Sequence, residues 1–241
     1  MRLVSLVPSV TEAVAAMGAG EHLVGVTDWC AVGAPAHAAR VGGTKSPSLA
    51  KIAALRPDVV VVNQEENRRE DAEALGAAGI EVLVTFPRTV ADVPPMLREL
   101  GALVRRASQA DAFACDLEEA LAEPVPDAAV PVLTLIWRKP WMAVGAGTFA
   151  DDLLHLAGFR NVLTDRSTPY PKVQALSAAP DVVLLPTEPY EFGEKDLSAV
   201  RELVGERPAL EFVDGQLLTW HGVRTATALR HFRAVARRLN Q

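Results

Sequence analysis

The aromatic residues of this chain concentrate in predicted loops. All four tryptophans and both tyrosines lie there, although the chain is only 5% aromatic. They are Trp29, Trp137, Trp141, Tyr170, Tyr190 and Trp220. Each tryptophan follows a predicted strand, and open parallel sheets bind their ligands beyond the carboxyl ends of the strands. A packing role explains any one of these rings, but the whole set predicts a cleft for a large planar or hydrophobic ligand.

Charged residues accompany the rings in the same loops. These candidates are Asp28, Glu65, Glu66, Arg88, Arg138, Lys139, Glu188, Glu191 and His221. A solvated surface role is the common fate of any single charged loop residue. His221 stands out because a neutral imidazole is a good metal ligand, but one histidine does not make a metal site. The pattern therefore predicts polar ligand contacts and no bound metal.

Signatures of catalysis are missing from the sequence. There is no HExxH, no P-loop, no GxSxG and no GxGxxG at a strand end. Gly145-Ala146-Gly147 followed by Thr148 is a short glycine turn into a helix, which is a weak indication of an anion site. We therefore expect a binding protein and not an enzyme.

A long helical pattern from Asp92 to Leu121 divides the chain. Apolar residues recur there at three- and four-residue spacing, as on one face of an amphipathic helix. Asp92 is the expected N-cap, and two prolines follow in the first turn, where they are tolerated. Gly101, and Ser108 with Asp111 three residues later, offer a place to split the pattern into two helices.

The segments on either side share one strand–helix grammar. The strands are expected at residues 2–6, 23–26, 59–62, 80–84, 130–136, 182–185, near 212 and up to 219. A capping box is expected at Ser9 with Glu12, Thr148 with Asp151 is expected to open a helix, and a helix closes the chain at Leu239. Pro57-Asp58 before a valine run is echoed by Pro180-Asp181, which indicates related halves, although this is also a common helix-to-strand joint. We expect an α/β fold with lobes at 1–91 and 124–241, mainly parallel sheets and a connecting helix at 92–123.

Composition limits the possible partners. The 241 residues are 49% hydrophobic and 22% charged, with a net charge of −6, which argues against nucleic acid. Cys30 and Cys115 are expected to be free thiols. No stretch has the length of a membrane span, and we expect a monomer. As written, the start shows no signal peptide, which predicts a cytoplasmic protein, or a periplasmic or cell-surface one if the start is trimmed.

Several segments, in order, resemble one family. Ser5 to Glu12, Gly25 to Cys30, Val41 to Gly43 with Leu49 to Asp58, and Tyr170 to Val173 are similar to the vitamin B12 and ferric-siderophore substrate-binding proteins of ABC importers. The resemblance implies the helical-backbone (class III, Fe/B12) periplasmic-binding fold, with a ligand held between two lobes. It implies cobalamin or a related corrinoid as the ligand and an ABC permease as the partner.

The resemblance and the loop positions together define the expected ligand-binding set. Its members are Pro8, Asp28, Trp29, Glu66, Arg88, Trp137, Trp141, Tyr170, Trp220 and His221. In the family, acidic residues on the lobes dock on permease arginines. Glu70 and Glu191 are the candidates here, whereas Arg69 and Gly222 depart from the acidic pattern.

Other ligands and one other class of protein stay open. A ferric siderophore would require arginines for an anionic chelate, for which Arg88 and Arg138 are placed, and haem would require an axial ligand such as His221. A cytosolic enzyme or regulatory module that reuses the fold would be marked by Glu65 and Glu66 facing His221.

Overall fold

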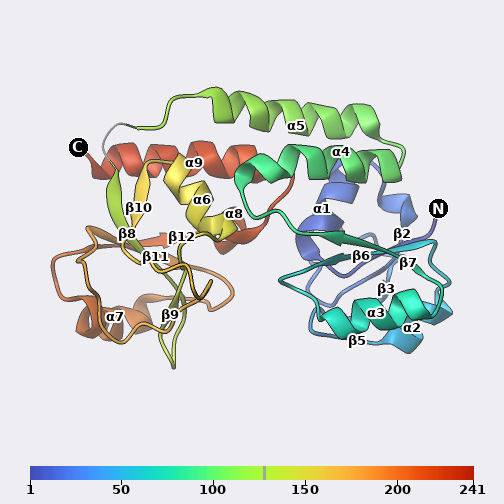
Figure 1. Cartoon of the computed structure of the whole chain (residues 1–241), viewed down its shortest axis with the longest axis horizontal. Helices are drawn as coiled ribbons and strands as arrows, with labels where there is room; N and C mark the ends of the chain where they lie inside the picture. The colour runs from blue at the N-terminus through green and yellow to red at the C-terminus, as the bar shows by residue number, and fades with distance from the viewer. Residues whose placement is uncertain (127–128) are drawn as a thin grey trace. The chain divides into compact units, whose positions relative to one another are not determined.

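The computed structural model describes residues 1–126 and 129–241. It divides the chain into two units, one of residues 1–87 and 92–118 and the other of residues 88–91 and 119–241 (Figure 1). Within the described residues, no helix is long and apolar enough to cross a bilayer.

The first unit is built on a five-stranded parallel sheet. Its order is β3-β2-β1-β6-β7. The strands are β1 (Leu3–Ser5), β2 (Leu23–Val26), β3 (Ala39–Arg40), β6 (Val59–Asn63) and β7 (Glu81–Thr85). A small antiparallel hairpin, β4 (Gly42–Gly43) with β5 (Ser46–Pro47), follows β3. All residues of β6 are buried, as expected for a central strand covered on both faces.

Helices cover both faces of this sheet. Val4 and Val60 pack with Ile52 of α2 (Leu49–Ala54) and Leu75 of α3 (Arg69–Ala77) on one face. Because side chains alternate along a strand, their neighbours in β1 and β6 point to the other face, where α1 (Pro8–Ala16) lies (Figure 1). A 3-10 turn, η1 (Gly20–His22), leads from α1 into β2.

The predicted connector is two helices. After the 3-10 turn η2 (Val90–Asp92), α4 (Val93–Leu103) and α5 (Ala107–Ala122) are separated by a turn in which Arg105 has φ 56°. The continuous alternative is therefore wrong, and the break lies after Gly101. Gly101 itself lies within α4 and does not break the helix. A glycine is needed at this position because a Cβ would overlap that of Ala110 across the turn.

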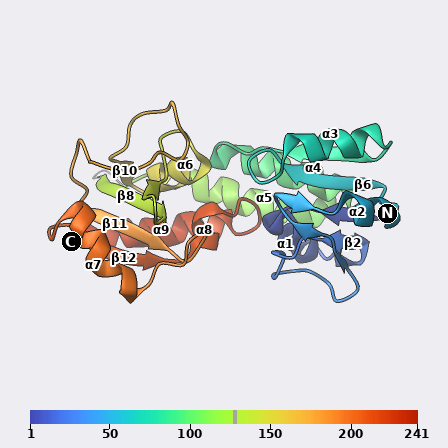
Figure 2. The ribbon, with the colours of Figure 1, turned by 90° about the horizontal axis from the view of Figure 1, so that it is seen from below.

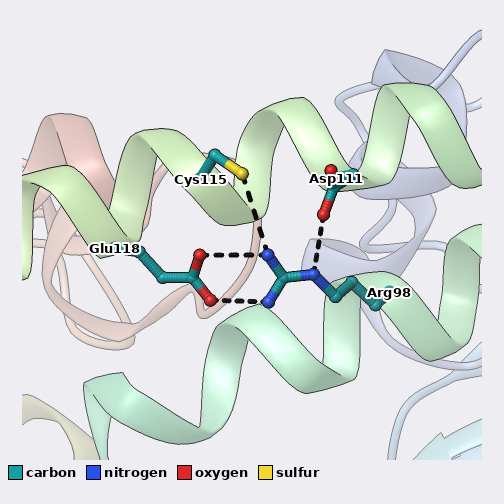
Figure 3. Close-up of polar contacts among 4 residues, drawn as sticks. All are labelled: Arg98, Asp111, Cys115 and Glu118. Atoms are coloured by element: carbon teal, nitrogen blue, oxygen red, sulfur yellow. Dashed lines mark hydrogen bonds and ion pairs between the residues drawn. The ribbon is translucent and has the colours of Figure 1, made fainter.

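A charge cluster joins these two helices. Arg98 of α4 donates two hydrogen bonds to Glu118 and one of 2.8 Å to Asp111, both on α5 (Figure 3). Its guanidinium also lies 3.8 Å from the sulfur of Cys115. The hydrogen bonds from Arg98 lower the pKa of Glu118, so this contact stabilises the pair at neutral pH and is lost when acid protonates Glu118.

The second unit repeats the layout of the first. Its parallel sheet has the order β10-β8-β11-β12, which Figure 2 shows. The strands are β8 (Val130–Trp137), β10 (Phe159–Asn161), β11 (Val182–Pro186) and β12 (Ala209–Val213), with β9 (Met142–Ala143) antiparallel to β8. Helix α7 (Leu197–Val204), after the 3-10 turn η3 (Glu194–Asp196), packs on one face, and α6 (Phe149–Leu156) and α9 (Thr225–Leu239) lie on the other (Figure 1).

The sequence echo falls on equivalent strands. β6 and β11 occupy the same place in the orders β2-β1-β6-β7 and β10-β8-β11-β12. The preceding aspartates even make equivalent bonds, because Asp58 N–H donates to Arg2 O at 2.8 Å and Asp181 N–H to Pro131 O at 2.9 Å. The repeated strand–helix pattern in the sequence thus corresponds to the same strand order in both sheets.

Two local predictions are wrong, and one is right only in part. Helix α1 begins at Pro8 after Val7, so Ser9 lies buried inside the helix and does not cap it. Asp92 lies at the N-cap position of α4, as predicted, but it has helical angles, φ −78° and ψ −14°, and its side chain makes no capping hydrogen bond. The predicted strand up to Thr219 is a short helix, α8 (Gly215–Thr219), whose start Asp214 caps through the N–H of Gln216. By contrast, Thr148 caps α6 as predicted.

Candidate ligand-binding surfaces

Trp29 projects from a braced turn at the carboxyl end of β2. Its side chain is 67% exposed, the most exposed large hydrophobic side chain described. The flanking residues are held by backbone bonds, Asp28 N–H to Gly42 O at 2.9 Å and Cys30 N–H to Thr27 O at 3.2 Å. Arg40 donates to the carbonyls of Thr27 and Cys30 at 2.7 and 3.0 Å. The turn is therefore fixed while its indole faces solvent.

Cys30 anchors the same turn from inside. Its side chain is fully buried, and its sulfur lies 3.1 Å from the hydroxyls of both Thr11 and Thr27. Cys30 and Cys115 are both free thiols, as predicted. We infer that Cys30 is a structural residue behind Trp29, because a buried thiol behaves as a small apolar group with weak hydrogen bonding.

Two buried asparagines shape the neighbouring loop. The amide oxygen of Asn67 accepts from Asn63 N–H at 2.7 Å, and its nitrogen donates to Leu6 O and Thr44 O at 3.1 and 3.0 Å. The side-chain oxygen of Asn63 accepts the N–H groups of Glu65 and Glu66 at 2.8 and 3.2 Å. These bonds tie the loop after β6 to that after β1 and hold Glu66, a predicted ligand contact, at the carboxyl edge of the sheet.

In the second unit, an aromatic cluster follows β8. Trp137 and Tyr190 meet edge to face at 5.8 Å, Tyr190 lies 4.7 Å from Phe192, and Trp141 stacks on Phe192 at 6.4 Å. Trp137 keeps 42% of its surface exposed. Three of the predicted rings therefore share one cluster, in which Trp141 packs inward and Trp137 lies at the surface.

Asp196 is the polar centre of this cluster. It is fully buried and accepts from Arg138, from the Tyr190 hydroxyl at 3.1 Å and from Gly193 N–H at 3.1 Å. Burial raises the pKa of this carboxyl, but the bonds from Gly193, Arg138 and Tyr190 outweigh that effect and lower it. Arg138 is thus engaged in an internal ion pair, which reduces its capacity to bind an anionic chelate.

A hollow of about 390 Å³ lies beside the turn after β8. Its lining residues are Arg138, Lys139, Pro140, Trp141, Ala199, Glu202 and Leu203. That volume lies near the lower end of the range for small-molecule sites, so it suits a ligand much smaller than a tetrapyrrole.

Trp220 lies at the carboxyl edge of the second sheet, but the element that precedes it differs from the prediction. It follows α8 and not a strand. Its Nε1–H donates to Glu188 Oε1 at 2.7 Å, and Glu188 lies just beyond β11. The guanidinium of Arg224 lies 5.3 Å from the centre of the ring, within cation–π range. The predicted location of Trp220 is thus right, and the predicted element is wrong.

His221 is packed inside the protein. It is 7% exposed and meets the ring of Phe149 edge to face at 5.9 Å. Burial lowers its pKa to about 4, so the imidazole is neutral at physiological pH. Among the described residues, no three His, Cys, Asp or Glu side chains are grouped to hold a metal ion.

The remaining predicted contacts differ in exposure. Pro8 is buried at the start of α1, which leaves it little surface for a ligand. Asp28 and Arg88 are exposed, and Tyr170 is half-buried in the loop before β11. Phe86, directly after β7 and 37% exposed, was not predicted, although its place after a strand could have indicated it.

The fold and these surfaces define a class of protein. Two α/β units with equivalent parallel sheets each present an indole at the carboxyl edge, where such sheets bind ligands. This is the architecture of a two-lobed binding protein.

Comparison with known proteins identifies the family. The model of the periplasmic binding protein family matches residues 3–212, and the chain belongs to that family. It is 27% identical over 200 residues to the vitamin B12-binding protein of Pectobacterium carotovorum subsp. carotovorum strain PC1, covering 78% of this chain and 72% of that protein. It is 28% identical over 192 residues to the vitamin B12-binding protein of Salmonella typhimurium, covering 76% and 71%.

Solved structures share the fold. The periplasmic haem-binding protein RhuT from Roseiflexus sp. RS-1 matches with a TM-score of 0.84 and 21% identity, over 100% of this chain and 99% of that one. The periplasmic vitamin B12-binding protein BtuF of Vibrio cholerae matches with a TM-score of 0.80 and 18% identity, over 100% and 98%. The chain is therefore a substrate-binding protein of ABC import with the class III fold and not an enzyme, as predicted.

Proposed function

We propose that this protein binds cobalamin or a related corrinoid for delivery to an ABC permease, with Trp29 and Trp220 as principal contacts. The observation that carries the proposal is the exposure of Trp29 on a braced turn. An exposed indole lacks the favourable free energy that burial of its apolar surface would provide, about 25 cal/mol per Å². Its burial against a flat apolar ligand would restore that free energy without reordering the turn.

The environment of the possible axial ligands favours a corrinoid over haem. Haem iron requires a protein ligand such as His, Tyr, Cys or Met, whereas cobalamin carries its own nucleotide base for cobalt. His221 and Cys30 are buried, and the Tyr190 hydroxyl is bound to Asp196. The second candidate function is haem binding, which the likeness to haem-binding structures favours, with the half-buried Tyr170 as the proposed axial ligand. A ferric siderophore is the weaker alternative, because Arg138 is already paired.

A ligand panel tests the proposal. Purified protein is mixed separately with cyanocobalamin, haemin and a ferric siderophore, and visible spectra and melting temperatures are recorded. We expect cyanocobalamin to raise the melting temperature, since a ligand at a hundredfold excess over Kd adds about 2.7 kcal/mol. Binding of haemin alone, abolished by Tyr170→Phe, would favour the haem reading instead. Binding of none of the three would contradict both.

We further propose that the protein acts outside the cytoplasm and docks on its permease through acidic residues. Glu70, in the first turn of α3, and Glu191, after β11, are both exposed. The family relationship supports export and outweighs the cytoplasmic expectation. Fractionation of the native organism should find the protein outside the cytoplasm, and recovery only with cytoplasmic markers would contradict export.

A further inference from the structure

Trp220 is one of four side chains that form a closed ring of contacts in the second unit. The indole donates to Glu188, and the Gln216 side chain also hydrogen-bonds to this carboxyl. Gln216 Oε1 in turn accepts from Arg224 at 3.0 Å, and Arg224 lies over the indole. Each of the four residues thus contacts two others, and the ring restricts the rotation of Trp220.

Glu188 is itself packed in place. A Cβ on Gly215 would lie 2.5 Å from Glu188 Cγ and 2.6 Å from its backbone nitrogen, so a glycine is required opposite it. Gly215 N–H also donates to Thr187 at 3.0 Å. The position of Glu188 at the end of β11 is therefore fixed by this packing, independently of its hydrogen bond to the indole.

We propose that Glu188 is a positioning residue that fixes the indole of Trp220 for ligand binding, so that affinity depends on its carboxylate form. The inference rests on the proposed function only in taking Trp220 as a ligand contact. A carboxylate that accepts an N–H makes a stronger bond than a neutral acceptor. Protonation of Glu188 should therefore loosen Trp220.

The surroundings of Glu188 raise its pKa, so it is protonated at a higher pH than an ordinary glutamate. Burial raises its pKa above 4.5, and the bonds from Trp220 and Gln216 oppose this. Two charged neighbours also act on it, since Asp214 raises the pKa and Arg224 lowers it. The hydrogen bond from Trp220 to Glu188 should thus weaken in mildly acidic solution, at a pH above 4.5.

The first test needs no ligand. The near-UV circular dichroism of wild-type protein minus that of Trp220→Phe isolates the Trp220 signal. We expect that signal to be reduced in Glu188→Ala, measured against Glu188→Ala/Trp220→Phe. As the pH is lowered, the Trp220 signal of the wild type should change with a midpoint above pH 4.5. In Glu188→Gln this transition should be absent. An unchanged Trp220 signal in Glu188→Ala would overturn the proposal.

The second test is a double-mutant cycle with cyanocobalamin. Loss of a charge-assisted hydrogen bond should weaken binding by about tenfold in Glu188→Ala. Glu188→Gln, which keeps an acceptor, should bind within about threefold of wild type. In the Trp220→Phe background, Glu188→Ala should have no further effect, because its role acts through the indole. An equal weakening in both backgrounds would overturn the positioning role. Failure of the wild type to bind would contradict the proposed function, and the dichroism would still decide the inference.

Discussion

At the residue scale, His221 shows how burial changes the role of a side chain. Its position beside Trp220 suggested a ligand contact, and the structure packs it against Phe149. Burial lowers its pKa from 6.5 to about 4. Its neutral form is therefore part of the folded state, whereas the unfolded chain takes up a proton below pH 6.5.

We expect His221 to make the protein acid-sensitive. Because the folded pKa is depressed, stability is lost as the pH falls from 6.5 to about 4, by about 3 kcal/mol in total. In His221→Gln this part of the loss should be absent. Chemical denaturation at pH 7 and pH 4 measures it, with His37→Gln at an exposed position as the control. An equal acid loss in wild type and His221→Gln would contradict this account.

The sequence predicted the type and approximate place of the site residues but not their surroundings. Loop position correctly placed Trp29 just beyond a strand, because strand ends are visible as the limit of an apolar run. It gave no information on the surroundings of Trp141, His221 and Arg138, whose partners Phe192, Phe149 and Asp196 are distant in sequence or belong to another element. Burial by such partners decides whether a residue can reach a ligand.

At the scale of elements, Gly101 permits the close approach of α4 and α5. A glycine inside a helix normally weakens it by about 0.5–1 kcal/mol relative to alanine. Here the missing Cβ makes room for Ala110, and Arg106 N–H bonds back to Gly101 O at 2.7 Å in the turn between the helices.

Gly101→Ala should therefore destabilise the protein, contrary to helix propensity. We expect the free energy of unfolding to fall by about 1–3 kcal/mol, as for other overpacked sites. Gly76→Ala in α3 is the matched control, because a Cβ there meets nothing within 4 Å. It should raise stability by about 0.5–1 kcal/mol. A stabilising effect of both substitutions in urea unfolding would show that the helices are not in tight contact at Gly101.

Arg233 makes a second element-scale anchor, in the second unit. It is 1% exposed on α9, and it donates to the carbonyls of Ala120, Glu123 and Leu156 at 2.6, 3.2 and 3.2 Å. It also pairs with the Glu123 carboxylate at 3.1 Å.

Arg233→Met should cost about 3 kcal/mol of stability, because it leaves the carbonyls without this donor. Arg237→Met, an exposed position on the same helix, should change stability by less than about 0.5 kcal/mol. Thermal unfolding of both variants measures the difference. Similar melting temperatures would mean that water replaces the lost donor.

Local errors of prediction have local causes. The capping box at Ser9 failed because the helix begins two positions earlier than predicted, at Pro8, and proline is a favoured first helical residue. The segment from Gly215 to Thr219 was taken for a strand because five residues are too few to show a helical period. Elements with long apolar patterns, such as β6, β8 and β11, were predicted within one or two residues.

At the scale of the whole molecule, one layout was used twice. The equivalent strand orders and the equivalent bonds of Asp58 and Asp181 agree with the repeated Pro-Asp-Val-Val pattern. Local sequence patterns do not encode the order of strands within a sheet, so only the repetition, and not the strand order, could be predicted. Each unit carries at least one indole at the carboxyl edge of its sheet, and the proposed binding function depends on Trp29 in the first unit and Trp220 in the second.

The affinity of Trp29→Ala for cyanocobalamin is the most direct test of this account. Isothermal titration should give a Kd about 30-fold or more above that of the wild type, as for loss of an aromatic hot spot. Val125→Ala, which removes an exposed apolar side chain near the amino end of β8, should bind as the wild type does. Equal dissociation constants for wild type and Trp29→Ala would contradict the claim that the exposed indole is held ready for the ligand.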